Sequence, residues 1–217
     1  MREAFQEQLD SMFHDLAGIC GNVETAVRLA TEALLTGDSS IAEKVISADV
    51  EIDRARERVE DSAFTLLSLQ QPVASDLRTV VAALRMVSDL ERMGDLSVHV
   101  AKIARLRVPH LAVPDDVRPT IERMALVAED MVRRVSKVIV DRDVEEAESL
   151  THADEEMDRL RRSSFTELLS ADWTHGVEAA VDVALLGRYY ERIADHAVSI
   201  AKRLVYLVTG ENPHGES

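Results

Sequence analysis

The sequence predicts an all-α protein built as two tandem, pseudo-symmetric three-helix bundles, with six long helices in all. Three observations support this prediction. Apolar residues recur with the period of an α-helix along almost the whole chain of 217 residues. Aromatic residues make up only 4% of the sequence, so the core must be aliphatic, which suits packed helices better than a β-sandwich. The second half of the chain, residues 110–217, also repeats the first half, residues 1–109.

Capping and breaking residues predict where the helices begin and end. Gly37 followed by Asp38 and Ser39 is typical of one helix ending and the next beginning. Four prolines fall between periodic segments instead of interrupting them: Pro72, Pro109, Pro114 and Pro119. The six predicted helices span residues 3–36, 39–69, 73–107, 115–141, 143–170 and 174–209.

Two pairs of segments carry the internal repeat. Residues 91–102 align with residues 191–202 at an offset of 191 − 91 = 100, and six of the twelve positions are identical. Residues 38–54 align with residues 143–159 at an offset of 143 − 38 = 105, and eight of seventeen are identical. Chance similarity between helices would rarely place the same acidic residues twice in the same order, so the chain contains a duplicated unit.

Charge and hydropathy exclude several classes of function. The chain has 40 acidic and 25 basic residues, a formal net charge of −15, and such a surface repels nucleic acids and anionic lipids. The longest stretch without a charged residue, residues 62–75, is shorter than the roughly 20 apolar residues that span a bilayer. Cys20 is the only cysteine and the N-terminus shows no signal peptide, which together indicate a cytoplasmic protein.

Acidic residues lie in or beside the apolar stripes of four predicted helices. Counting about 100° per residue from Leu84, Glu91 and Asp95 each fall about 20° from the centre of the stripe in the third helix. The last helix repeats this pattern, and the second and fifth helices carry acid pairs on the flank of their stripes. The candidate site residues are Asp49, Asp53, Glu91 and Asp95 in the first half, and Asp154, Asp158, Glu191 and Asp195 in the second.

Ionised carboxylates against an apolar core are costly unless an opposite charge compensates them. A hard, oxygen-preferring cation such as magnesium, manganese, calcium or iron would give one metal site in each half. Arginines offer a second compensation, because Arg56, Arg92 and Arg192 lie close enough in sequence to form ion pairs with these acids. A third interpretation is that the stripe faces water in a cleft. The spacing alone leaves all three open.

The remaining chemistry-bearing residues point away from catalysis. His99 lies near the acidic face and is a weaker candidate ligand, whereas His196 points away from Glu191 and is expected at a surface or an interface. The predicted helices lack the Glu-x-x-His pairs of ferritin-like di-iron bundles. The sequence also has no phosphate-binding glycine loop and no nucleophile motif, so we expect no enzymatic activity.

Two stretches of the first half resemble the PhoU family of phosphate-signalling regulators. They are QQPVASDLR at residues 70–78 and DLERMGD at residues 89–95. YERIADH at residues 190–196 is similar to the family's second copy, although Ala194 stands where the first copy has Gly94. The second copy also lacks the Gln-Gln-Pro turn.

The resemblance implies two three-helix bundles, frequent homodimerisation, and E/D-x-x-x-D motifs that bind iron, zinc, manganese or magnesium, in some cases as multinuclear centres. It implies a negative regulator of phosphate uptake and phosphate-starvation signalling, acting as an adaptor between a phosphate importer ATPase and a sensor histidine kinase. Such an adaptor would be recruited to the inner face of the membrane by its partners. The alternative function is a carboxylate-bound metal storage or redox bundle, against which the missing Glu-x-x-His pairs argue.

Overall fold

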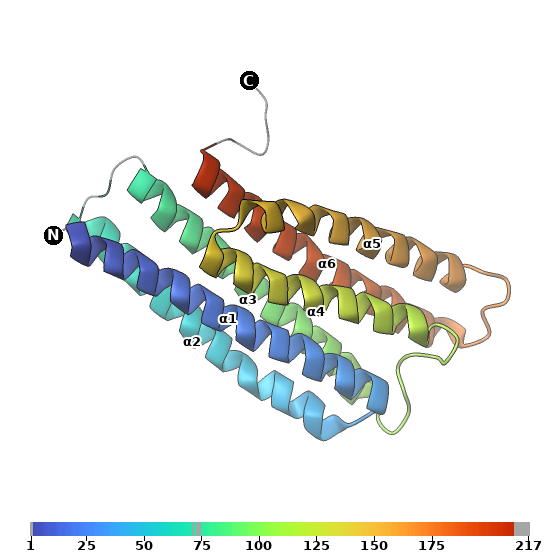
Figure 1. Ribbon diagram of the computed structural model, residues 1–217. Coiled ribbons are helices and arrows are strands. Elements are labelled where there is room, and N and C mark those ends of the chain that lie inside the picture. Colours follow the sequence, from blue (N-terminus) through green and yellow to red (C-terminus); the bar gives the residue numbers. More distant parts are fainter. Residues whose placement is uncertain (1, 71, 73–74, 211–217) are drawn as a thin grey trace.

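A computed structural model describes residues 2–70, 72 and 75–210 (Figure 1). The described residues form six α-helices and no strand, which confirms the predicted fold class. The helices are α1 (Arg2–Thr36), α2 (Ser39–Gln70), α3 (Ser75–Arg107), α4 (Arg118–Asp141), α5 (Val144–Leu168) and α6 (Gly176–Thr209).

The predicted helix boundaries are close to the observed ones, and the capping residues explain most of them. Gly37 has a φ of +70°, a left-handed conformation that glycine adopts without strain at the end of α1. Asp38 then caps α2, because its Oδ1 accepts a hydrogen bond from the Ser40 amide at 2.8 Å. Asp143 caps α5 in the same way, through the Glu146 amide at 3.0 Å.

The start of the fourth helix was predicted too early. α4 begins at Arg118, which is 118 − 115 = 3 residues later than expected, with Pro119 in its first turn. Proline is favoured there because the first turn leaves its amides without intrahelical acceptors. The predicted start of the third helix, at residue 73, lies outside the described residues.

The helices pack as two three-helix bundles joined side by side. α1, α2 and α3 contact one another, α4 packs against α5 and α6, and α5 packs against α6. The bundles meet through α1 against α4 and α3 against α6, so that α2 and α5 lie on opposite flanks of the molecule (Figure 1). The apolar core is continuous across both halves. The division at residues 109 and 110 therefore stays a prediction about folding units.

The core is aliphatic, as the composition predicts, with one buried aromatic anchor. Its largest fully buried side chains are mostly methionine, leucine and isoleucine, together with Tyr190. The Tyr190 hydroxyl lies 2.8 Å from Thr31 Oγ1, which ties α6 of the second half to α1 of the first. No helix within the described residues is long and apolar enough to cross a membrane.

Candidate metal and ion-pair centres

The first acidic cluster lies where α2 packs closely against α3. A Cβ atom added to Gly94 would lie 2.9 Å from Ile52 Cδ1 and 3.3 Å from Asp49 Oδ1. Because these distances leave no room for a side chain, glycine permits the close approach of the two helices at this level. Asp49 of α2 is thereby held against the face of α3 that carries Glu91 and Asp95.

Electrostatics show that the four predicted acids of the first half act on one another. Partial burial raises the pKa of Asp49 to about 6, and repulsion from Asp95, Asp53 and Glu91 adds to this effect, while Lys102 opposes it. The pKa of Glu91 is also raised, first by burial and then by Asp95. The first cluster therefore concentrates negative charge in a partly desolvated contact between α2 and α3. We call this contact the first seam, with Asp49, Asp53, Glu91 and Asp95, and the matching contact between α5 and α6 the second seam.

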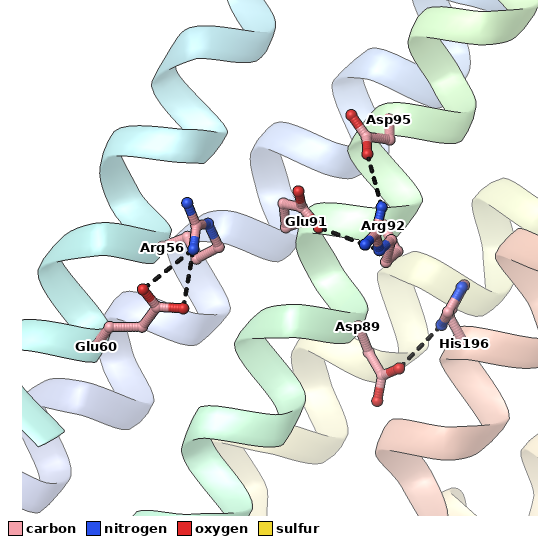
Figure 2. Close-up of polar contacts among 7 residues, drawn as sticks. All are labelled: Arg56, Glu60, Asp89, Glu91, Arg92, Asp95 and His196. Carbon is pink, nitrogen blue, oxygen red and sulfur yellow. Dashed lines mark hydrogen bonds and ion pairs between the residues drawn. The ribbon is translucent and has the colours of Figure 1, made fainter.

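The basic residues near the first cluster compensate its charge only in part. Arg56 of α2 binds Glu60 one turn further along the same helix, with Nη1 3.0 and 3.1 Å from its carboxylate oxygens (Figure 2). Arg92 reaches Asp95 at 3.4 Å and Glu91 at 3.7 Å, but its side chain is 61% exposed. Exposed ion pairs of this kind contribute about 0–1 kcal/mol. Arg92 and Arg56 lower the pKa of Glu91, and Lys102 lowers that of Asp49, but burial and repulsion between the acids outweigh them and both pKa values stay raised.

The second acidic cluster forms at the matching seam between α5 and α6. Burial raises the pKa of Asp154 to about 6, followed by repulsion from Asp195 and Asp158, with a smaller contribution from Glu191. Lys202 lowers it slightly. The structure therefore brings together the four predicted acids of the second half, as it does those of the first.

Glu191 differs from its counterpart because two arginines neutralise it. Arg161 Nη1 of α5 forms an ion pair with Glu191 Oε1 at 2.8 Å, and Arg188, one turn earlier on α6, binds the other carboxylate oxygen. The Glu191 side chain is only 8% exposed, so these two ion pairs form in a largely desolvated site. Arg188 has no basic counterpart in the first half, where Ser88 stands at the equivalent position (188 − 88 = 100).

One substitution between the repeats explains the different arginine partners. Arg161 is equivalent to Arg56, and Phe165 to Glu60, both at the offset of 105 (161 − 56 and 165 − 60). In the second half the phenyl ring offers no carboxylate, and the Arg161 guanidinium lies 5.5 Å from its centroid while binding Glu191. The ion-pair interpretation therefore holds for Glu191 and, through the exposed Arg92, for Glu91 and Asp95, whereas Arg56 pairs with Glu60.

The acids are gathered in each seam without forming a closed cage. Among the residues that the structure describes, no three His, Cys, Asp or Glu side chains converge closely enough to hold a metal ion as they stand. Binding would therefore require the carboxylates to rotate toward a cation. Metal binding by the eight predicted residues stays a prediction.

A polar network at the interface between α3 and α6 was missed by the sequence analysis. His196 Nδ1 lies 2.9 Å from Asp89 Oδ1, as expected for an interface histidine (Figure 2). Asp89 Oδ2 also accepts hydrogen bonds from Ser199 Oγ and Arg203 Nε, each at 3.2 Å. The sequence does contain a signal for this network. Asp89 precedes Glu91 by two residues and so lies about 200° around α3 from it, on a different face from the acidic cluster.

Two further contacts join the same pair of helices. Arg107 of α3 binds both Glu178 and the buried Asp182 of α6, with Nη2 3.1 Å from Asp182 Oδ1. The ring of His99 stacks on Tyr189 of α6, with 5.3 Å between the ring centroids. His99 thus has an aromatic contact across the interface, and the two halves are joined by charge and stacking as well as by the apolar core.

Comparison with known proteins identifies the architecture. The PhoU domain model matches residues 16–104 and 121–204, once in each half. The phosphate-specific transport system accessory protein PhoU homolog 2 of Mycobacterium tuberculosis is 46% identical over 213 residues, which cover 98% of this chain and all of that protein. The PhoU homolog 1 of Mycobacterium leprae is 43% identical and matches the whole chain and 98% of its own length.

A solved structure agrees with these sequence matches. The crystal structure of PhoU from Pseudomonas aeruginosa superposes with a TM-score of 0.87 at 27% identity, covering 95% of this chain and 100% of that one. Both bundles, and their packing against each other, are therefore shared with a solved structure.

The different compensation of the two glutamates predicts different responses to neutralisation. Glu191→Gln should lower the free energy of unfolding by about 1–3 kcal/mol, because two arginines lose a desolvated charged partner. Glu91→Gln should change it by less than about 0.5 kcal/mol or raise it, because it relieves repulsion from Asp95. Urea unfolding of both variants in excess EDTA measures the difference. Equal losses in the two variants would contradict the asymmetry.

The raised pKa of Asp49 predicts the sign of a pH effect. Between about pH 4 and 6 folded Asp49 retains a proton that the unfolded chain has released, so folding stability falls as the pH rises through this window. The stability of Asp49→Asn relative to wild type should therefore increase over that range and then level off. Asp154→Asn should show the same trend, since its pKa is also raised to about 6. Urea unfolding at stepped pH in EDTA measures it, and a difference independent of pH would refute it.

Proposed function

The chain belongs to the PhoU family, and on this basis we propose that it is a non-catalytic negative regulator of phosphate uptake and phosphate-starvation signalling. Family membership implies an accessory role in phosphate transport. The observation that carries the proposal is the extent of the match, because both repeats fit the family and the relatives named as transport accessory proteins align over nearly their whole length.

The finer role that we propose is that of an adaptor between a phosphate importer ATPase and a sensor histidine kinase. Six helices, each of 24 to 35 residues, give long surfaces on which two partners can bind at once. The net charge of −15 favours partners with basic surfaces and speeds their association. The chain would act in the cytoplasm, at the inner face of the membrane, through these partners. Homodimerisation stays a prediction.

We also propose that the acidic seams bind a metal ion, and that the first seam does so in preference to the second. Carboxylate oxygens are the donors that magnesium, manganese and iron prefer, and zinc accepts them. Burial and then repulsion from neighbouring acids raise the pKa of Asp49, and a cation would relieve the repulsion. In the second seam, Arg161 and Arg188 already neutralise Glu191, which leaves less charge for a metal. The ion would stabilise the packing of α2 on α3 without entering a reaction.

Partner capture tests the adaptor proposal. The tagged chain, taken from phosphate-replete cells, should recover an importer ATPase and a sensor kinase, identified by mass spectrometry. Arg92→Glu should reduce this recovery several-fold, because it reverses an exposed charge beside the first seam. Arg54→Glu is the matched control, since Arg54 is also 61% exposed and also pairs with an acid three residues away. Recovery of neither protein after gentle cross-linking would refute the adaptor role, and equal effects of the two variants would exclude the Arg92 surface.

Thermal unfolding tests the metal proposal. Saturating manganese should raise the melting temperature of the wild type, because binding to the folded state alone stabilises it. EDTA should abolish that gain. Glu91→Gln should lose the gain because it removes a ligand from the preferred seam, and Glu191→Gln should retain it. A manganese response that survives Glu91→Gln would place the ion elsewhere.

A further inference from the structure

A groove lies between the first turns of α3 and the last turns of α6. Its volume is about 340 Å³, and its lining includes Leu77, Arg78, Val81 and Arg85 from α3, and Arg203 and Tyr206 from α6. Figure 1 shows that these two helix ends lie together at one end of the molecule. The groove is separate from both acidic seams, because the residues that line it include none of the eight predicted ligands.

The groove is basic in a protein that is strongly acidic. The Arg78 guanidinium lies over the Tyr206 ring, 5.1 Å from its centroid. Arg203 Nε donates a hydrogen bond to Asp89 Oδ2 at 3.2 Å. Within the described part of the chain, no carboxylate lies within ion-pair distance of Arg78 or Arg85. The residues that line the groove include three arginines and no acid, although the chain as a whole has 40 acidic and 25 basic residues. Two neighbouring arginines without an ion-pair partner leave a local positive potential.

Comparison of the two repeats shows that the groove lacks the ion pairs that form at the equivalent place in the interface between α3 and α6. At the opposite end of the interface between α3 and α6, Arg107 binds Glu178 and Asp182 and so closes that end internally. Arg78 occupies the position equivalent to Glu178 (178 − 78 = 100), and Leu207 occupies the position equivalent to Arg107 (207 − 107 = 100). The charge of the α3 residue is therefore reversed, and its neighbour on α6 cannot complement it. An acid from outside the chain would restore the pairing.

We propose that this groove is a docking site for an acidic amphipathic helix of another protein. Arg78 and Arg85 are 85 − 78 = 7 residues apart, two turns or about 10 Å along one face of α3. Leu77 and Val81 lie beside and between them, and their side chains are 43% and 36% exposed. A helix with acids two turns apart and aliphatic residues between them matches this pattern in charge and hydropathy.

Two other occupants fit the groove less well. A small anion such as phosphate would bind the arginines but leave Leu77 and Val81 in water. A second copy of the chain, related by a twofold axis through the groove, would place Arg78 and Arg85 against the same residues of its partner. Like charges face each other in that arrangement, and the repulsion opposes the contact. The mixed lining therefore favours a partner helix.

The inference deepens the proposed adaptor function by giving one partner a docking surface and a chemistry. The test uses a fluorescein-labelled helical peptide with two glutamates seven residues apart and leucines between them, titrated with the purified full chain. Fluorescence anisotropy should show binding that weakens as salt is added. Arg85→Glu should weaken binding at least about tenfold, the scale of a lost charge-assisted pair. Arg85 is exposed, so the variant should fold, which circular dichroism verifies.

Controls separate the groove from general electrostatic attraction. Arg133→Glu changes the same charge on the exposed face of α4 and should leave the affinity within about twofold. A peptide with lysines in place of the glutamates should bind Arg85→Glu better than it binds the wild type. Absence of binding to the wild type, or an equal loss in Arg133→Glu, would overturn the proposal. So would displacement of the peptide by millimolar inorganic phosphate, or a change of oligomeric mass in Arg85→Glu.

This test is independent of the test of the adaptor role. The peptide assay uses purified components, so its failure would leave the capture of an importer ATPase and a kinase unaffected. Failure of that capture would in turn leave a measured peptide affinity, and its loss in Arg85→Glu, as properties of the groove itself.

Discussion

The structure depends on how buried negative charge is compensated at two equivalent helix seams. One aspartate in each seam is held partly out of water, because Asp49 and Asp154 are partly buried and each has its pKa raised to about 6. Replacing these two aspartates would relieve repulsion, so the stability of the fold gives no reason for their presence, whereas Glu191 is stabilised by two arginines. Sites that oppose folding in this way are typical of binding sites.

Duplication has given one scaffold two ways of compensating this charge. In the second half, a phenylalanine in place of Glu60 frees the equivalent arginine to bind Glu191, and Arg188 adds a second positive charge. In the first half, burial and repulsion from Asp95 raise the pKa of Glu91, which is why we propose that a cation would bind there in preference. The two halves also differ at the ends of the interface between α3 and α6. At one end Arg107 forms ion pairs within the chain, and at the other end lies the basic groove. Each half therefore presents a different surface, as the proposed adaptor with two unlike partners would require.

The sequence predicted the elements well because their signals are local. Helical periodicity, the Gly37–Asp38 cap and the repeat offsets place six helices to within a few residues, and helical angles place Glu91 and Asp95 in a seam. The arginine partners were not predictable, since Arg56 can reach either Glu60 or the seam and only packing decides between them. The groove was not predictable for another reason. It forms between the start of α3 and the end of α6, whose meeting depends on how the two bundles pack together.

The most direct test of this account is to locate a paramagnetic cation on the isotope-labelled chain. Manganese added in substoichiometric amounts should broaden the amide resonances of Gly94 and Asp95 first, while those of Ala194 and Asp195 remain sharp, since broadening by Mn²⁺ falls steeply with distance. That result would show that the first seam binds the ion and that arginines have reduced binding in the other. Equal broadening in both seams, earlier broadening at Ala194, or none in either seam would contradict the account.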